Sequence, residues 1–165
     1  MIRIFALIIT FISNTASAQM TDSAKQDAEN LTNQFFDFGV ENLTKYGEFY
    51  PYGAAMTPDG TFIAVAVETE SVNDNPLSQM VIDDLKEAFR DGARTGRFAA
   101  TALFYDVRIT LPETGLMTDA IAVAVDHEDD YSVKLMIPYT LTDGVVTLGA
   151  PILQIGENDI FGNGS

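Results

Sequence analysis

The sequence predicts an α+β domain in which an antiparallel sheet of five to six strands carries one helix on each face. Two segments have apolar residues at helical spacing, and several others alternate between turn residues, which gives the order α-β-β-α-β-β-β. The turns between most strands are short, and short turns join antiparallel neighbours. Two strands have Ala on one face and Ile or Val on the other, so both faces of the sheet should be covered.

Residues 1–18 have the three parts of a cleavable secretory signal peptide. Arg3 supplies the positive charge, segment 4–12 is almost entirely apolar, and residues 16–18 (Ala-Ser-Ala) form an A-x-A cleavage site. The apolar run is shorter than the roughly 20 residues that a permanent anchor needs. We therefore expect an exported protein, periplasmic or extracellular, with a single α+β domain over residues 19–165 and no membrane anchor after cleavage.

The mature chain would be strongly acidic. The whole sequence has 9 Lys and Arg against 24 Asp and Glu, and removal of residues 1–18 would take away only Arg3, so the formal net charge would change from −15 to −16. Such a surface repels phosphate backbones and anionic lipid headgroups. We expect no nucleic-acid partner, whereas a cationic protein or a divalent ion would be attracted. Solubility alone also explains such a charge.

The sequence contains no cysteine and one histidine. Disulfides, zinc–thiolate sites, iron–sulfur clusters and cysteine nucleophiles are therefore excluded. A single histidine also excludes the common catalytic metal sites that use several histidines. We expect no cofactor, and we expect the fold to be held by packing alone.

The first elements are a helix and a hairpin. Apolar residues at helical spacing predict a helix over 23–46, and Gly47 suits the position just after its end. Strands are expected over 49–56 and 61–68. The segment 57–60 (Thr-Pro-Asp-Gly) between them is a strong turn signal, because Pro fixes one backbone angle and Gly permits a left-handed one.

The remaining chain adds a helix, three strands and a short extension. Pro after Asn75 predicts the start of the second helix, and Gly96 its end. Residues 156–165 are expected to be a polar tail in which Ile160 and Phe161 fold back. Strands are expected over 98–111, 120–125, 131–141, 145–148 and 152–155.

Two resemblances accompany this pattern. The element order is similar to that of profilin-like and roadblock-like domains, in topology only, so no function transfers. Segments 47–53 (Gly-Glu-Phe-Tyr-Pro-Tyr-Gly), 118–121 (Thr-Asp-Ala-Ile) and 137–139 (Ile-Pro-Tyr) resemble a group of small bacterial α+β proteins without assigned activity. That resemblance covers residues 30–161 and implies no catalytic residues.

Asp106, Asp119 and His127 are the candidate catalytic residues. Asp106 and Arg108 lie on one face of a predicted strand, and Asp119 begins the next strand. Two carboxylates near an arginine can support acid–base chemistry, or can form an exposed ion pair at a bend. His127 can act as a general base beside a carboxylate, but its place at a strand end entering a turn predicts that it is exposed.

The acidic residues around His127 are candidate calcium ligands, since calcium takes six to eight oxygen ligands. They lack the D-x-D-x-D-G spacing that wraps a loop around the ion. Carboxylates on a hairpin turn are also typical of a solvated edge that discourages aggregation. The candidates are Asp126, Glu128, Asp129 and Asp130.

An aromatic cluster supplies the candidate binding residues Phe36, Tyr50 and Tyr52. A helix cannot bury Phe35, Phe36 and Phe38 equally well on one face. Part of the cluster is therefore expected to be exposed and to mark a partner surface, where Tyr and Phe are enriched. Core packing is the alternative explanation.

Together these features predict an exported, acidic, non-enzymatic module that binds another exported protein. The alternative is a carboxylate-dependent hydrolase or a small-ligand-binding protein with a pocket near Asp106, Asp119 and His127. A calcium-responsive domain is a third interpretation. The sequence carries no signal for an oligomeric state.

Overall fold

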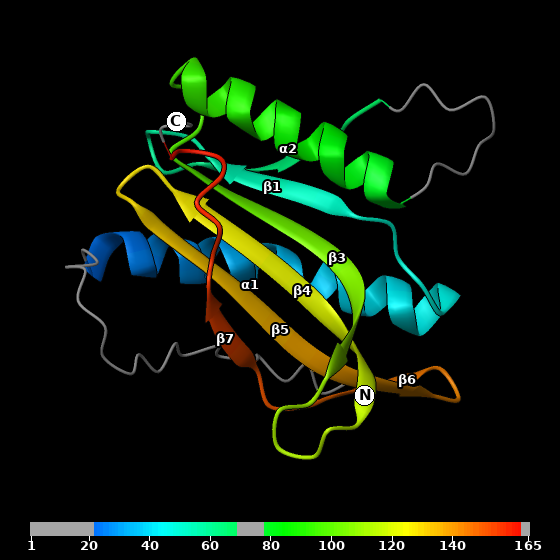
Figure 1. Cartoon of the computed structure of the whole chain (residues 1–165). Helices are drawn as coiled ribbons and strands as arrows, with labels where there is room; N and C mark the ends of the chain where they lie inside the picture. The colour runs from blue at the N-terminus through cyan, green and yellow to red at the C-terminus, as the bar shows by residue number, and fades with distance from the viewer. Residues whose placement is uncertain (1–21, 69–77, 163–165) are drawn as a thin grey trace.

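The computed structural model describes residues 22–68 and 78–162, which form two helices packed on one antiparallel sheet (Figure 1). The predicted α+β class, the element order and the placement of a helix on each face are confirmed. The sheet has seven strands rather than five or six. In chain order the elements are α1 (Asp22–Tyr46), β1 (Tyr52–Met56), β2 (Phe62–Val65), α2 (Ser78–Arg94), β3 (Ala100–Thr110), β4 (Met117–His127), β5 (Tyr131–Thr142), β6 (Val145–Leu148) and β7 (Ile152–Ile155).

Two sequence predictions fall outside the described residues. They are the signal peptide over 1–18 and the start of the second helix at Asn75 and Pro76, and both stay predictions. Within the described ranges, neither helix combines the length and the apolar character needed to cross a membrane.

The strands follow the spatial order β2-β1-β3-β4-β5-β6, and β7 also pairs with β5. Every pair is antiparallel. The turn predicted over 57–60 is present, with Gly60 at a φ of +83°. Between β5 and β6, Asp143 and Gly144 have φ values of 51° and 74°. A tight two-residue hairpin requires this left-handed backbone, so the Asp-Gly pair fixes the register of β6.

The outer edge of β5 is covered by two short strands with a bulge between them. In β6, Leu148 pairs with Tyr139, and in β7, Ile152 pairs with Met136. The intervening residues 149–151 therefore face only two residues of β5, which is the one-residue excess of a β-bulge. This bulge divides one edge strand into the two short strands predicted over 145–148 and 152–155, and both belong to the sheet.

α1 covers the face of the sheet that carries the branched side chains of β4 and β5, and lies behind the sheet in Figure 1. Its wholly buried residues Ala24, Ala28, Leu31 and Leu43 recur at helical spacing. Gly47 follows the helix at a φ of +80°, as predicted. The sheet side chains in the same core cluster include Phe104, Ile121, Val123, Val125, Leu135 and Ile137.

α2 covers only part of the opposite face. Leu85 and Phe89 pack over β1 and β3 together with Leu103. Gly53 permits this close approach, because a Cβ there would lie 2.8 Å from Phe89 Cζ. Over β4 and β5 the chain after β7 crosses the same face instead (Figure 1). Ile160 is buried in the α2 cluster, which confirms that this segment folds back onto the domain.

Candidate functional site

The structure does not bring the three candidate catalytic residues together. Asp106 and Asp119 lie toward the β3–β4 turn. His127 ends β4, eight residues beyond Asp119, and an extended strand spans roughly 26 Å over that distance. Any chemistry at Asp106 would therefore proceed without the histidine.

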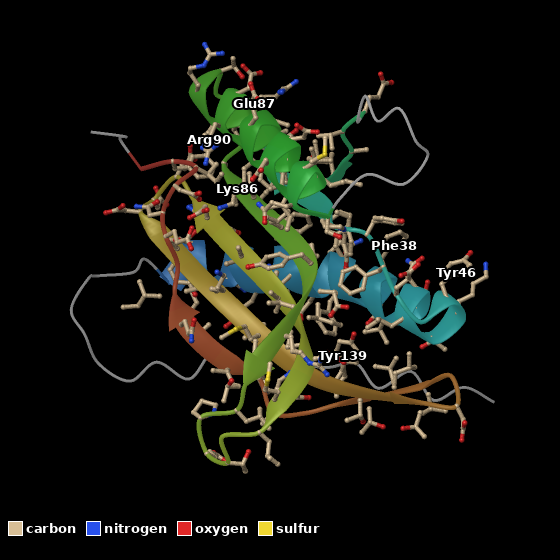
Figure 2. All side chains as sticks on the ribbon, turned by 45° about the vertical axis from the view of Figure 1, so that its right-hand side comes forward. Phe38, Tyr46, Lys86, Glu87, Arg90 and Tyr139 are labelled. Carbon is tan, nitrogen blue, oxygen red and sulfur yellow. The ribbon has the colours of Figure 1, made fainter. Side chains whose placement is uncertain are left out.

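Asp106 is held by a tyrosine rather than by the neighbouring arginine. The Tyr139 hydroxyl (Figure 2) donates to its two carboxylate oxygens at 3.1 and 3.2 Å, whereas Arg108 Nε lies 3.5 Å from Asp119 Oδ1. Burial raises the pKa of Asp106, the Tyr139 hydrogen bond opposes this rise, and the Asp119 charge adds to it. Burial and the Asp106 charge likewise raise the pKa of Tyr139. The bond spans β4 and joins β3 to β5.

His127 is buried, and the prediction that it is exposed is wrong. Its side chain is only 4% exposed, and Nε2 lies 3.4 Å from Asp27 Oδ2 of α1 without forming a hydrogen bond. Nδ1 accepts the backbone N–H of Asp129 at 3.0 Å. Nδ1 therefore serves as an acceptor, and Nε2 is the ring nitrogen that faces α1. The first turns of α1 cover this end of β4, which no local pattern at the turn reveals.

The acidic residues around His127 do not converge. Successive strand residues point to opposite faces, so Asp126 is buried on the α2 side while His127 lies under α1. Glu128 and Asp129 are exposed, and Asp130 accepts a hydrogen bond from the C-terminal segment at 2.7 Å. Among residues 22–68 and 78–162, no three His, Cys, Asp or Glu side chains are placed to hold a metal ion.

Of the three candidate binding aromatics, only Tyr50 is exposed, at 47%. Phe36 is 3% exposed and belongs to the α1 core, so it offers no surface to a partner. The buried stripe of α1 passes through Phe36, and this places Phe38 outside it, with 54% of its surface exposed. The prediction that part of the cluster is exposed is confirmed, but Phe38 takes the place assigned to Phe36.

Tyr52 is a structural residue, because it inserts its hydroxyl into α1. The hydroxyl donates to the Phe35 carbonyl at 2.9 Å and accepts the Gly39 N–H at 3.1 Å. An uninterrupted helix would join these two groups directly. Gly39 leaves the space, since a Cβ there would lie 3.0 Å from the hydroxyl oxygen. The ring stacks on Phe104 with centroids 4.6 Å apart, and burial raises the pKa of Tyr52.

A cavity of about 180 Å³ lies on the α2 side of the sheet. It is bounded by α2, by the faces of β3, β4 and β5, and by the chain after β7. Ile82, Leu103, Tyr105 and Ala124 supply much of its apolar surface. The charged residues that line it are Lys86, Asp126, Lys134, Glu157 and Asp159.

The two lysines of this cavity are paired with carboxylates of the C-terminal segment. Lys86 Nζ lies 2.9 Å from Asp159 and 3.6 Å from Glu157, and Lys134 Nζ lies 3.7 Å from Glu157. Burial acts to lower the pKa of Lys86, but these carboxylates hold it above its usual value. Burial acts to raise the pKa of Asp159. The hydrogen bond and the positive charge of Lys86 outweigh this effect, so the pKa of Asp159 is lowered. Figure 2 shows Lys86 on α2 beside the outward-facing Glu87.

Asp126 is the carboxylate of the cavity that no cation contacts directly. The residue is 5% exposed, and its Oδ1 has no hydrogen-bond partner. Burial raises the pKa of Asp126, and the negative charges of Asp159 and Glu157 add to the rise. A hydrogen bond from Ser132 and the positive charge of Lys86 oppose it. A buried acceptor without a partner is costly. This cost marks Asp126 as the chemically unusual group of the site.

Asp126→Asn should stabilise the protein at neutral pH. The raised pKa means that the folded state binds the proton more tightly than the unfolded state, so the ionised carboxylate opposes folding. This penalty is present above the folded-state pKa and is lost as the pH falls toward the ordinary value of about 3.9. The variant should therefore have a higher Tm than the wild type at pH 8, and the difference should shrink on acidification. A difference that is independent of pH would contradict this account, and Glu87→Gln is the control for loss of an exposed charge.

Sequence reasoning missed Lys86, Lys134 and Asp159. One signal was available: Ser132 and Lys134 alternate with apolar neighbours along β5, which indicates a face that is not fully covered. Asp159 belongs to a segment without regular structure, and its position depends on how that segment crosses the sheet.

The chain matches no known protein family, and no curated protein or solved structure is significantly similar to it.

Proposed function

We propose that the protein is an exported, non-enzymatic module that binds another protein through an aromatic patch formed by Phe38, Tyr46 and Tyr50. The observation that carries the proposal is the exposure of these residues, which is 54%, 63% and 47%. Figure 2 shows Phe38 and Tyr46 on the C-terminal half of α1. Large exposed aromatics are uncommon on surfaces that contact only water, and they are enriched in protein interfaces.

The chain reversal after α1 brings Tyr50 back toward the half of the helix that carries Phe38 and Tyr46. Residues 47–51 return along α1, because Tyr52, which follows them, bonds to Phe35 and Gly39 in the middle of the helix. Tyr50 therefore lies alongside the last turns of α1. Phe38 packs edge-on against the Tyr52 ring with centroids 4.9 Å apart. Phe38, held in this way, loses little side-chain freedom on binding, which favours affinity.

The surroundings of the patch favour a cationic partner surface. Asp37, Glu41 and Glu48 are exposed on the same stretch of chain. Lys45 is the single cation among them, and its Nζ lies 4.8 Å from the Tyr46 ring centroid. Carboxylates beside aromatic faces suit Arg or Lys side chains with apolar neighbours. The partner should therefore present such residues, and its binding should weaken as salt is added.

Site-specific photo-crosslinking tests the proposal in the organism's own exported fraction. A photoreactive amino acid at Tyr46 should give one discrete adduct, whereas the same group at the equally exposed Met117 of the β3–β4 hairpin should not. The adduct counts as support only if the purified partner binds the purified protein directly and more weakly at high salt. Identical adduct patterns from both positions would remove the proposal.

A double substitution gives the expected magnitude. Phe38→Ala with Tyr50→Ala should weaken binding of that purified partner by at least about tenfold, as for interface residues that anchor a partner. Leu116→Ala with Met117→Ala removes a comparable exposed apolar pair elsewhere and should leave affinity unchanged. Both variants should keep the wild-type Tm within a few degrees, because the residues are exposed. Equal loss of binding in both variants would contradict the assignment of the patch.

Export is supported by the pattern of residues 1–18 and has its own test. Mass spectrometry of the protein recovered from the periplasm or medium should find a mature N-terminus at Gln19. An intact Met1 on the functional protein would overturn the exported assignment without bearing on the aromatic patch.

A further inference from the structure

We propose that the cavity between α2, β3–β5 and the segment 156–161 binds a small organic amine, with the ammonium group of the ligand placed against the Asp126 carboxylate. This site is separate from the aromatic patch, which lies on α1 on the other face of the sheet. The proposal therefore stands independently of protein binding at that patch.

The size of the cavity sets the size of the ligand. Its volume is about 180 Å³, and an apolar protein cavity of about 150 Å³ is known to accommodate benzene. The body of the ligand should therefore have roughly six to ten non-hydrogen atoms. Ile82, Leu103 and Ala124 present apolar surface to such a body, and Tyr105 adds an aromatic ring. Apolar walls with a few polar groups are typical of small-molecule sites.

The pairing of charges around the cavity favours a cationic group at Asp126. Lys86 and Lys134 are both within 4 Å of carboxylates of the C-terminal segment, so their charges are already compensated. Arg90 Nη2 also lies 3.2 Å from Asp159, so three cations and three carboxylates are grouped around the cavity. Asp126 is the one carboxylate of the lining without a cation in contact. An ammonium group placed against Asp126 would supply the contact that this carboxylate lacks, whereas an anionic group there would be repelled.

The hydrogen-bonding state of Asp126 favours an amine over a metal ion. Its Oδ1 makes no hydrogen bond, and the residue is 95% buried, since 5% of its surface is exposed. An ammonium group donates up to three hydrogen bonds and can serve this acceptor and the Ser132 hydroxyl that also lines the cavity. A metal ion needs several ligands at once, and the described residues offer no group of three. A buried group left without a partner is a recognised mark of functional sites.

The route into the cavity lies beside the C-terminal segment. The Glu157 side chain is 66% exposed, whereas the Lys86, Lys134 and Asp159 side chains are 25%, 28% and 30% exposed. The mouth of the cavity is therefore bordered by the solvated Glu157 carboxylate, which attracts cations. A ligand that enters there with its ammonium end first reaches Asp126, and its apolar body then lies against the walls of the cavity.

Isothermal titration calorimetry with three probes of one shape tests the proposal. Benzylamine should bind the purified full chain, and benzyl alcohol and benzoate should bind at least about tenfold more weakly, since they lack the positive charge. Equal affinity for the amine and the alcohol would overturn the proposal, because the site would then recognise only the apolar body. Absence of benzylamine binding at millimolar concentration would overturn it as well.

Two variants locate the interaction. Asp126→Asn should weaken benzylamine binding by at least about tenfold and remain folded, while Glu87→Gln removes an exposed charge one residue from Lys86 and should leave affinity unchanged. Ala124→Leu fills the floor of the cavity and should abolish binding in a protein whose circular dichroism is that of the wild type. Retention of full affinity by a folded Asp126→Asn protein would overturn the assignment of the ammonium to this carboxylate.

Discussion

Tyr52→Ala should lower the free energy of unfolding by about 2–4 kcal/mol, because Tyr52 is partly buried and removal of a fully buried aromatic side chain costs about 3–5 kcal/mol. The substitution deletes the ring that stacks on Phe104 and the hydroxyl that bridges the Phe35 carbonyl and the Gly39 N–H. It leaves a space between α1 and the sheet that neither element can fill alone. Urea unfolding followed by circular dichroism measures the loss.

Tyr52→Phe separates the ring from the hydroxyl. It keeps the stack on Phe104 and removes only the two hydrogen bonds, so the expected loss is about 1–2 kcal/mol. If Phe is as damaging as Ala, the hydroxyl inside the helix is the dominant contribution and the packing argument is wrong. If neither substitution lowers the free energy of unfolding, Tyr52 does not join α1 to β1 in solution.

Gly92→Ala should destabilise the protein by about 1–3 kcal/mol, although Ala favours a helix interior over Gly by about 1 kcal/mol. A Cβ at this position of α2 would overlap the ring of Phe98, which is itself buried. The ring has little freedom to move, because the Gly92 carbonyl accepts the backbone N–H groups of Arg97 and Phe98 and fixes the turn that carries it. Thermal and urea unfolding should agree on the sign.

A double-mutant cycle tests whether the clash is with that ring. Phe98→Leu is destabilising by itself, but it should reduce the cost of Gly92→Ala, giving a coupling of at least about 0.5 kcal/mol. Strict additivity of the two changes would show that the loss comes from somewhere else in α2. Ala in place of the exposed, left-handed Gly60 provides a comparison in which backbone strain acts without any clash.

The parts of the fold that follow from local chemistry could be predicted from the sequence. Helical spacing located α1, the turn over 57–60 located the first hairpin, and the Asp143-Gly144 pair located another. The two apolar faces of β4 also predicted a helix on each side of the sheet. Each of these features depends on neighbours a few residues apart, and side-chain periodicity and turn chemistry act over that range.

The sites could not be predicted in the same way, because they depend on which distant segments meet. His127 is buried because α1 lies over the end of β4, and the cavity exists because α2 stops short of β4 and β5 while residues 156–161 cross them. Phe36, which the sequence analysis expected at the partner surface, and Phe38, which is exposed instead, lie two positions apart on α1. Such a shift turns a side chain through about 200°, and the tertiary contacts decide it.

The bulge over residues 149–151 has a consequence for how copies of this protein behave at high concentration. The strands β6 and β7, which form this edge, carry Val145 and Ile155, whose exposed fractions are 62% and 84%. A straight apolar edge of this length would template the addition of further strands and the growth of fibrils. Here the extra residue interrupts the edge, and Pro151 offers no N–H to an incoming strand. Each half is only four residues long, so this edge is protected against pairing with another copy even though it carries exposed apolar side chains.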